Sequence, residues 1–410
     1  MTRIYIILLA LTGWLMTAGA QEGALKLSAV QAERIFLEQN LLLLAERMNV
    51  EAAEAAVVQA GLWDNPELSV GDINFWQEGE PRQFSVELSQ MISTGGKRGR
   101  LVGREKVSRE IALLDFEIVL LEMKAALRET VYEMAYLQSC RQALELSEQS
   151  LRRLIEACRK QLASGNISGP ELLRLESALL ELASMKNGSH TAFREQQRKL
   201  RSLLNLKPNV DVVVDEPDTV KTAELPPAEE LLQMALEGRP DLKQAYRQRL
   251  YHEKSLAYER AMRLPDLNLR ATYDRYGGVW RDFAGVGISF DLPLPNRNQG
   301  NIRAAAAAVN RSDYLLRNRE NMLRNEVDEA LANYSQASAF YAMVSNNELF
   351  GELDAMLEVY ARRLLSKDIG MPEYIDFLYS YKTNKEIMFS ARKQLLQARE
   401  QLRLAVGSDI

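Results

Sequence analysis

Two segments of about 65 residues, 99–163 and 301–365, contain no proline and are rich in residues that favour helices. At 1.5 Å per residue, each would form a rod of about 97 Å. Apolar residues in the first segment recur at the 3-4-3-4 spacing of a coiled-coil seam: Ile111, Leu114, Ile118, Leu121 and Ala125. Such rods cannot bury themselves in a globule of this size, so we expect them to need neighbours along their whole length.

Each rod ends at a sequence typical of a helical hairpin. A short polar segment with glycine precedes Pro170 in the first case and Pro372 in the second. Glycine suits the left-handed conformation at a helix end, and proline suits the first turn of the next helix. We therefore predict two helical hairpins, over about 99–206 and 301–406.

The two halves of the chain carry the same landmarks in the same order. Residues 65–68 correspond to 264–267 at an offset of 199, and residues 86–89 correspond to 286–289 at 200. At an offset of 202, the first set of hairpin residues matches the second: Ser164, Ile167, Pro170 and Glu171 with Ser366, Ile369, Pro372 and Glu373. We infer two structural copies, 21–206 and 228–410, joined by a linker over 207–227.

Each copy is expected to begin with a helix, followed by two strands. The helical segments, 28–62 and 228–263, are rich in Ala, Leu and Glu. The strands lie within about 66–93 and 265–293, where apolar and polar residues alternate. The alternation slips near Gly71-Asp72, which indicates a β-bulge.

The four strand segments are each about ten residues long, the length of a tilted membrane strand. Aromatic residues near their ends suit a membrane interface: Phe75, Trp76, Tyr276, Trp280 and Phe283. The alternative is a half-buried sheet beneath the helices, outside any membrane. In a membrane, one face would meet lipid and the other a polar lumen, with these candidates facing inward: Glu87, Arg270, Asp274 and Asp291.

Four strands leave two open edges, which the hydrocarbon of a bilayer does not tolerate. Closed membrane barrels start at about eight strands, so a barrel would have to be shared between subunits. Two chains would supply eight strands and three would supply twelve, and this argument does not choose between them.

The first twenty residues read as a secretory signal peptide, 1–20, with cleavage after Ala20. Arg3 precedes an apolar stretch, 4–16, and small residues follow it. The alternative is an uncleaved anchor helix. Gln21 excludes lipid attachment at that position, because attachment requires cysteine. No other segment has 18 consecutive apolar residues, so we expect an exported chain without a transmembrane helix.

Composition points away from enzymes and nucleic-acid binding. The 51 basic and 56 acidic residues are mixed throughout, without a polybasic run. Two cysteines and two histidines cannot form a zinc cluster, so neither a metal site nor a cofactor is expected. An exported helical enzyme is therefore a weak hypothesis, because no nucleophile or base cluster is visible.

Three segments, 90–100, 290–300 and 235–242, resemble the TolC family of outer-membrane efflux channels. The first two are similar to the family's strand-to-helix crossings, and their key residues are Gly95, Gly96, Pro293, Pro295 and Gly300. The Gly-Gly-Lys-Arg sequence at 95–98 is similar to the heavy-metal-efflux branch. The resemblance implies a mainly α fold with a membrane β-barrel part: a homotrimer whose twelve-stranded barrel crosses the outer membrane and continues into the periplasm as a helical barrel.

The resemblance also implies a passive exit duct, in contact with outer-membrane lipid, for an inner-membrane pump of the RND type and a periplasmic membrane-fusion adaptor. Family members close at the hairpin tips, so the candidates for the constriction are Asp376, Glu373, Asp368, Arg174 and Glu171. Three copies of Asp376 around an axis would favour cations. The alternative for Asp376 is a solvated acid at a helix start.

The adaptor-docking candidates lie at the two hairpin turns: Gly165, Asn166, Ile167, Ser168, Lys367, Ile369 and Gly370. A second class of function remains open, a periplasmic coiled-coil adaptor or scaffold protein without a pore.

Overall fold

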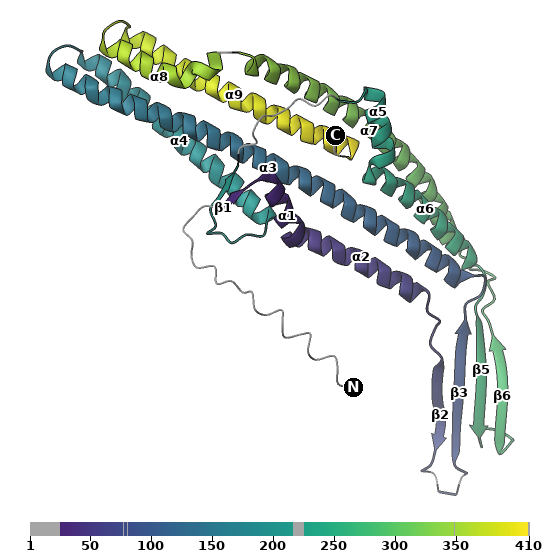
Figure 1. Cartoon of the computed structure of the whole chain (residues 1–410). Coiled ribbons are helices and arrows are strands. Elements are labelled where there is room, and N and C mark those ends of the chain that lie inside the picture. Colours follow the sequence, from purple (N-terminus) through teal and green to yellow (C-terminus); the bar gives the residue numbers. More distant parts are fainter. Residues whose placement is uncertain (1–24, 77, 80, 216–224, 348, 409–410) are drawn as a thin grey trace, which may run out of the picture. The chain divides into compact units, whose positions relative to one another are not determined.

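The computed structural model describes residues 25–76, 78–79, 81–215, 225–347 and 349–408 (Figure 1). The predicted signal peptide, 1–20, lies outside these residues. The chain forms two compact units, and each draws segments from both halves of the sequence. The described parts of the first unit fall within 25–38, 130–215 and 357–379. The other described residues form the second unit.

A four-stranded antiparallel sheet lies in the second unit (Figure 1). Its strands are β2 (Glu67–Asn74), β3 (Gln83–Ile92), β5 (Leu267–Arg275) and β6 (Asp282–Ser289), in the order β2-β3-β5-β6. The central pair, β3 and β5, joins the two halves of the sequence, and β2 and β6 form the edges.

The register gives this sheet one apolar and one polar face. Val70 lies opposite Val86, Val86 opposite Tyr273, and Tyr273 opposite Ala284, so these side chains share one face. Glu87 lies opposite Thr272 on the other face. The predicted bulge near Gly71-Asp72 is confirmed, because the register of β2 shifts between Gly71 and Asn74.

The initial helix expected in each copy is two helices in the structure. Residues 28–62 form α1 (Ala29–Gln39) and α2 (Leu41–Ala60), and residues 228–263 form α5 (Ala228–Gly238) and α6 (Pro240–Ala261). The first break is at Asn40, whose side chain accepts a hydrogen bond from the Leu43 N–H at 2.9 Å. The second is at Pro240, which starts α6 because it cannot donate a backbone hydrogen bond.

The first predicted rod is one helix of 67 residues, α3 (Lys97–Ala163), followed by α4 (Gly169–Leu203). The prediction of one helix over 301–365 is wrong, because α7 (Gln299–Ser345) ends before α8 (Leu349–Leu365) begins. Asn346 and Asn347 stand at this break, and asparagine disfavours a helix interior because its side chain can compete for backbone hydrogen bonds, so the segment breaks without a proline. The last helix is α9 (Met371–Val406).

In the unit that contains the sheet, α5 and α6 pack against α7 (Figure 1). Their core includes Leu231 of α5, Leu242 of α6, Leu323 of α7 and Leu402 of α9, all almost completely buried. In the described part of the chain, no helix has both the length and the apolar character that a membrane-spanning helix needs.

The segment predicted as a linker, 207–227, contains a buried strand, β4 (Val212–Val214). It pairs in parallel with β1 (Leu25–Leu27) in the first unit. Gln138 of α3 holds β4 from the side, because its amide donates to the Val214 carbonyl at 2.8 Å and accepts from the Val214 N–H at 3.0 Å. Strand pairing therefore anchors part of the connection between the two halves.

Candidate functional site

The hairpin turns after α3 and α8 have the same backbone conformation at equivalent positions. Gly165 has a φ of +75° and Lys367 a φ of +65°, which is the left-handed region. Most of the predicted adaptor-docking residues at these turns are exposed. Ile369 is the exception, since only 7% of it is exposed. Ile167 is half-buried.

Glu171 and Asp368 are both held by groups at their own turn. Glu171 accepts hydrogen bonds from the Ser168 N–H at 2.8 Å and the Ser168 hydroxyl at 2.7 Å, within a capping box at the start of α4. These Ser168 bonds lower the pKa of Glu171. Asp368 accepts from the Ser366 hydroxyl at 2.6 Å. Both carboxylates therefore stabilise the turn geometry.

Asp376 of α9 and Arg174 of α4 line one groove of about 450 Å³. The other lining residues come from the same two helices: Leu173, Ser177, Ala178, Glu181, Pro372, Ile375 and Tyr379. Tyr379 donates a hydrogen bond to Glu181 at 2.6 Å across the groove. The structure brings Arg174 and Asp376 together here, while Glu373 is exposed on α9 but does not line the groove.

Aromatic residues fix α9 beneath this groove. Tyr374 is fully buried, and burial raises its pKa to about 12. Phe377, directly after Asp376, stacks on Tyr360 of α8 with ring centroids 3.9 Å apart. Because Tyr374 and Phe377 face their neighbours, Asp376 is left on the exposed side of the helix.

The crossing from β3 to α3 is clasped by the segment that precedes β5. Lys97 Nζ lies 2.7 Å from Asp266 Oδ2, and the Lys97 side chain is only 7% exposed. The Thr94 N–H donates to Asp266 Oδ1 at 2.9 Å. Gly95 has a φ of +62°, and a Cβ on it would lie 2.5 Å from Leu264 Cδ1. The predicted Gly95-Gly96 turn is therefore needed, whereas the charged clasp was not foreseen.

The second crossing turns at Asn298, within the predicted segment 290–300. Gly300 lies in the first turn of α7, and Asn298 adopts the left-handed conformation instead, with a φ of +58°. Its side-chain amide donates to the Glu259 carbonyl at 2.9 Å. Pro293 and Pro295 line a cavity of about 640 Å³ beside this crossing.

Three of the four predicted lumen-facing residues share the polar face of the sheet. Arg270 Nε lies 3.4 Å from Glu87 Oε1. Asp274 also lies on this face, where it accepts from the Gly277 N–H at 2.9 Å. Asp291 follows β6, which ends at Ser289, so it belongs to the crossing and not to the strand.

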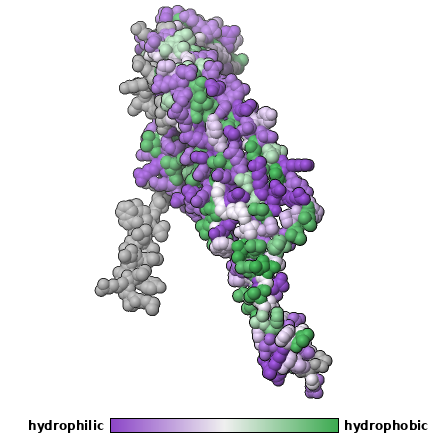
Figure 2. Space-filling model, turned by 90° about the vertical axis from the view of Figure 1, so that its right-hand side faces the viewer, coloured by the Kyte–Doolittle hydropathy of each residue, from purple (hydrophilic) through white to green (hydrophobic). Residues whose placement is uncertain are grey.

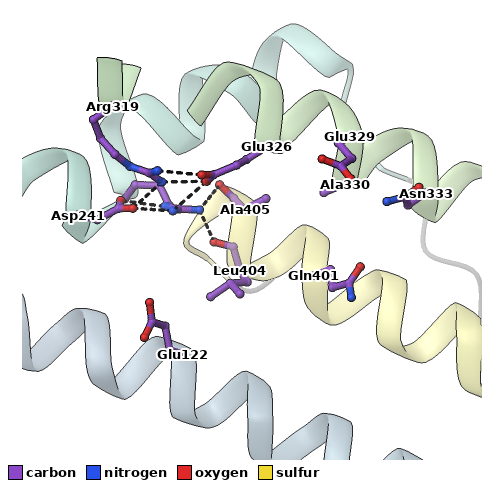
Figure 3. Close-up of a pocket in the computed structure, with 11 residues that line it drawn as sticks. Glu122, Asp241, Arg319, Glu326, Glu329, Ala330, Asn333, Gln401, Leu404 and Ala405 are labelled. Atoms are coloured by element: carbon purple, nitrogen blue, oxygen red, sulfur yellow. Dashed lines mark hydrogen bonds and ion pairs between the residues drawn. The ribbon is translucent and has the colours of Figure 1, made fainter. Parts of the chain in front are cut away.

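Sequence reasoning missed a cluster of four charged residues. Arg239 is 8% exposed and reaches Asp241 Oδ2 at 2.6 Å and Glu326 at 3.1 Å. Arg319 reaches the same two carboxylates, Asp241 at 2.6 Å and Glu326 at 2.8 Å, and Figure 3 shows these side chains pointing toward one another. Arg239 also donates to the carbonyl of Leu404 at the end of α9, at 2.9 Å.

The charges of this cluster neutralise one another. Burial opposes ionisation of Asp241, but hydrogen bonds and charges from Arg239 and Arg319 hold the pKa of its carboxyl below the usual value. The hydrogen bond to Glu326 raises the pKa of Arg319. The cluster lines a cavity of about 420 Å³ in the unit that contains the sheet. Its geometry is that of a clamp joining α6, α7 and α9.

The family model described as outer membrane efflux protein matches residues 34–206 and 231–348. The chain belongs to this family. Outer membrane efflux proteins similar to it include the cobalt-zinc-cadmium resistance protein CzcC of Cupriavidus metallidurans, 27% identical over 313 residues that cover 74% of this chain and 72% of the relative. The nickel and cobalt resistance protein CnrC of the same organism is 26% identical over 67% of this chain and 66% of its own length.

Solved outer-membrane channels share the fold. The CmeC channel of Campylobacter jejuni superposes with a TM-score of 0.79 at 15% identity, over 92% of this chain and 85% of that one. VceC of Vibrio cholerae superposes with a TM-score of 0.74 at 14% identity, over 93% and 96%.

Family and fold together confirm the predicted outer-membrane efflux channel, mainly helical and extending from the outer membrane into the periplasm. The alternative of a periplasmic adaptor without a pore finds no support among these matches.

Proposed function

We propose that the protein is a passive homotrimeric exit duct, joined through a periplasmic adaptor to an inner-membrane pump of the RND type. The four-stranded sheet carries the proposal, because it has one apolar face and two edges that find no partner strand among the described residues. In a bilayer these edges require further strands. Three chains would supply twelve strands, with the polar face of Glu87, Arg270 and Asp274 toward the lumen.

Purified protein in detergent tests this assembly. We expect light scattering to give the mass of three chains, and the trimer to conduct ions across a planar bilayer. A monomer that stays folded without detergent and forms no pore would overturn the proposal. We also expect the first residue of the protein extracted from outer membranes to be Gln21, because Arg3, the apolar stretch 4–16 and the small residues after it form a signal-peptide pattern that ends at Ala20.

We infer that the cargo includes divalent heavy-metal cations. The relatives named for resistance to cobalt, zinc, cadmium and nickel support this inference. The test is to delete the gene from its host and compare growth in zinc, cobalt, nickel and cadmium salts with growth in detergents and drugs. Increased sensitivity to the metals alone is expected, and increased sensitivity to drugs alone would refute the inference.

We propose that Asp376 forms the constriction at the hairpin tips, with Glu373 and Arg174 nearby. Its exposure on α9 and its place in the groove beside Arg174 support this role. Three carboxylates around an axis concentrate cations and repel one another. Asp376→Asn is expected to reduce block of the channel by divalent cations, whereas Glu156→Gln, at an exposed acid on α3, should leave block unchanged. Equal block in both trimers would exclude Asp376 from the constriction.

A further inference from the structure

The two edge strands of the sheet, β2 and β6, both carry exposed apolar side chains. Nearly every residue of β2 and β6 is exposed, whereas the inner strands β3 and β5 are partly covered by their neighbours. Leu68 of β2 and Ile288 of β6 are 66% and 68% exposed. Figure 2 shows apolar side chains gathered where this sheet meets the helices. Each edge therefore presents both backbone groups and apolar side chains for a further strand.

The pairing of β3 with β5, here called the internal joint, shows how two neighbouring strands are held together where they meet the helices. Ile92 and Leu267 are partners at the helix-proximal end of the pair. Just beyond them, Lys97 and Asp266 form the buried ion pair at 2.7 Å. Apolar contact within the sheet is thus followed by a charged clasp at its border.

The duplication places an equivalent set of residues on the two free edges. An offset of 200 carries Ile92 to Leu292 and Lys97 to Arg297, and an offset of 199 carries Leu267 to Leu68 and Asp266 to Glu67. All four positions keep their chemical type: two apolar residues, one cation and one carboxylate. Leu292 and Arg297 follow β6, whereas Glu67 and Leu68 begin β2.

The two charges at the free edges lack an ionic partner within the described residues. Glu67 begins β2 and is exposed. Arg297 is exposed in the crossing after β6, where its Nε donates weakly to the Leu294 carbonyl at 3.3 Å. An exposed carboxylate on one edge and an exposed guanidinium beside the other are complementary between two copies of the chain.

We propose that β6 of one subunit pairs with β2 of the next, with Arg297 bound to Glu67 of the partner subunit and Leu292 opposite the partner subunit's Leu68. Each seam of the assembly then repeats the internal joint between β3 and β5. The inference rests on the oligomeric channel proposed above and identifies the contacts and register that close it.

This register also preserves the faces of the sheet. It places Phe290 opposite Val70 of the partner subunit, so apolar residues continue on one face from one subunit to the next. A register displaced by one residue would instead alternate apolar and polar side chains across the seam. Residues 290–292 follow β6 without regular pairing in the single chain, and the partner's strand would extend β6 over them.

Disulfide cross-linking tests the register in a chain with Cys140→Ala and Cys158→Ala. Leu68→Cys combined with Leu292→Cys is expected to give covalent dimers and trimers on oxidation, because directly opposed Cβ atoms lie about 4.5–5.5 Å apart. Ile92→Cys with Leu267→Cys is the matched control, and its cross-link should stay within one chain. Leu68→Cys with Ile288→Cys, displaced by four residues, should not cross-link.

The outcomes separate this inference from the proposed assembly. Trimers of normal mass that lack the seam cross-link, while the internal control forms, would overturn the register and leave the trimer intact. Efficient cross-linking of the displaced pair would also overturn it. Absence of any oligomer in the uncross-linked parent protein would instead overturn the proposed trimeric channel, and this inference with it.

Charge reversal tests the ion pair itself. Glu67→Arg and Arg297→Glu are each expected to favour dissociation of the trimer in detergent, and the double variant should restore it. Exposed ion pairs change an equilibrium by up to about five-fold each, and three seams act together. If the double variant dissociates more than either single variant, with no recovery of the trimer, the pairing is refuted.

Discussion

Removing the Arg239 guanidinium should open the joint that it clamps. Arg239→Ala deletes two contacts to Asp241, one to Glu326 and two to the carbonyls at the end of α9. Arg239 itself is only 8% exposed, so water cannot readily replace its guanidinium in these contacts. We expect the free energy of local opening to fall.

The magnitude follows from what remains after the change. Breaking a buried charge pair by removing one partner costs about 3–5 kcal/mol. The low end applies here, because Arg319 stays 2.6 Å from Asp241 and 2.8 Å from Glu326 and continues to neutralise both carboxylates. The two freed carbonyls, of Leu404 and Ala405, each lose a hydrogen bond of about 1 kcal/mol. These two lost hydrogen bonds make up about 2 kcal/mol of the low-end cost of about 3 kcal/mol, which corresponds to roughly 150-fold more frequent opening.

Amide hydrogen exchange in residues 399–408 measures this opening directly. Arg247→Ala is the matched control, because Arg247 lies 3.1 Å from Glu110 but both side chains are nearly half exposed. Exposed pairs contribute at most about 1 kcal/mol, so the control should change exchange less than about five-fold. Exchange in the Arg239→Ala protein that matches the control would refute the clamp.

Three further substitutions test local geometry. Lys367→Gly should relieve the left-handed strain at the α8–α9 turn, by about 1 kcal/mol, and slow amide exchange there about five-fold. Faster exchange would show that the lysine side chain stabilises the turn by other contacts. Gly95→Ala should reduce the yield of folded protein from outer membranes several-fold, because its Cβ meets Leu264, whereas Gly99→Ala, in open space, should not; equal yields would contradict this reading. The Ser168 bonds lower the pKa of Glu171, so its stabilisation of α4 should persist above the ordinary glutamate pKa and disappear as the pH falls through the lowered one. Glu171→Gln should remove that pH dependence of the exchange protection factors in residues 168–174, and an unchanged dependence would exclude Glu171 as its source.

Features set by neighbouring residues could be predicted from the sequence. The bulge at Gly71-Asp72 disturbs a local alternation, and the turn before Pro170 carries its own glycine and capping serine. The long helix α3 follows from 67 residues without a proline. Each of these signals lies within a few residues of the structure that it specifies.

Features set by distant partners could not be read in the same way. The Val212–Val214 strand requires Leu25–Leu27, which lies far away in the sequence. The pairing of Lys97 with Asp266 likewise requires β3 and β5 to be neighbours. The break after Ser345 is hard to predict for another reason, since it contains no proline and adjacent asparagines disfavour a helix only weakly.

Equivalent positions in the two copies show how a duplicated chain separates local from long-range information. Asn40 and Arg239 both stand where the initial helix breaks, but Asn40 caps its own helix through Leu43, whereas Arg239 contacts distant helices. The backbone break is kept because neighbouring residues determine it, and the side chain changes because the surroundings differ. Lys97 and Arg297 keep the same charge, which is expected where the surroundings are alike. Retention of that charge therefore favours a subunit seam built like the internal joint.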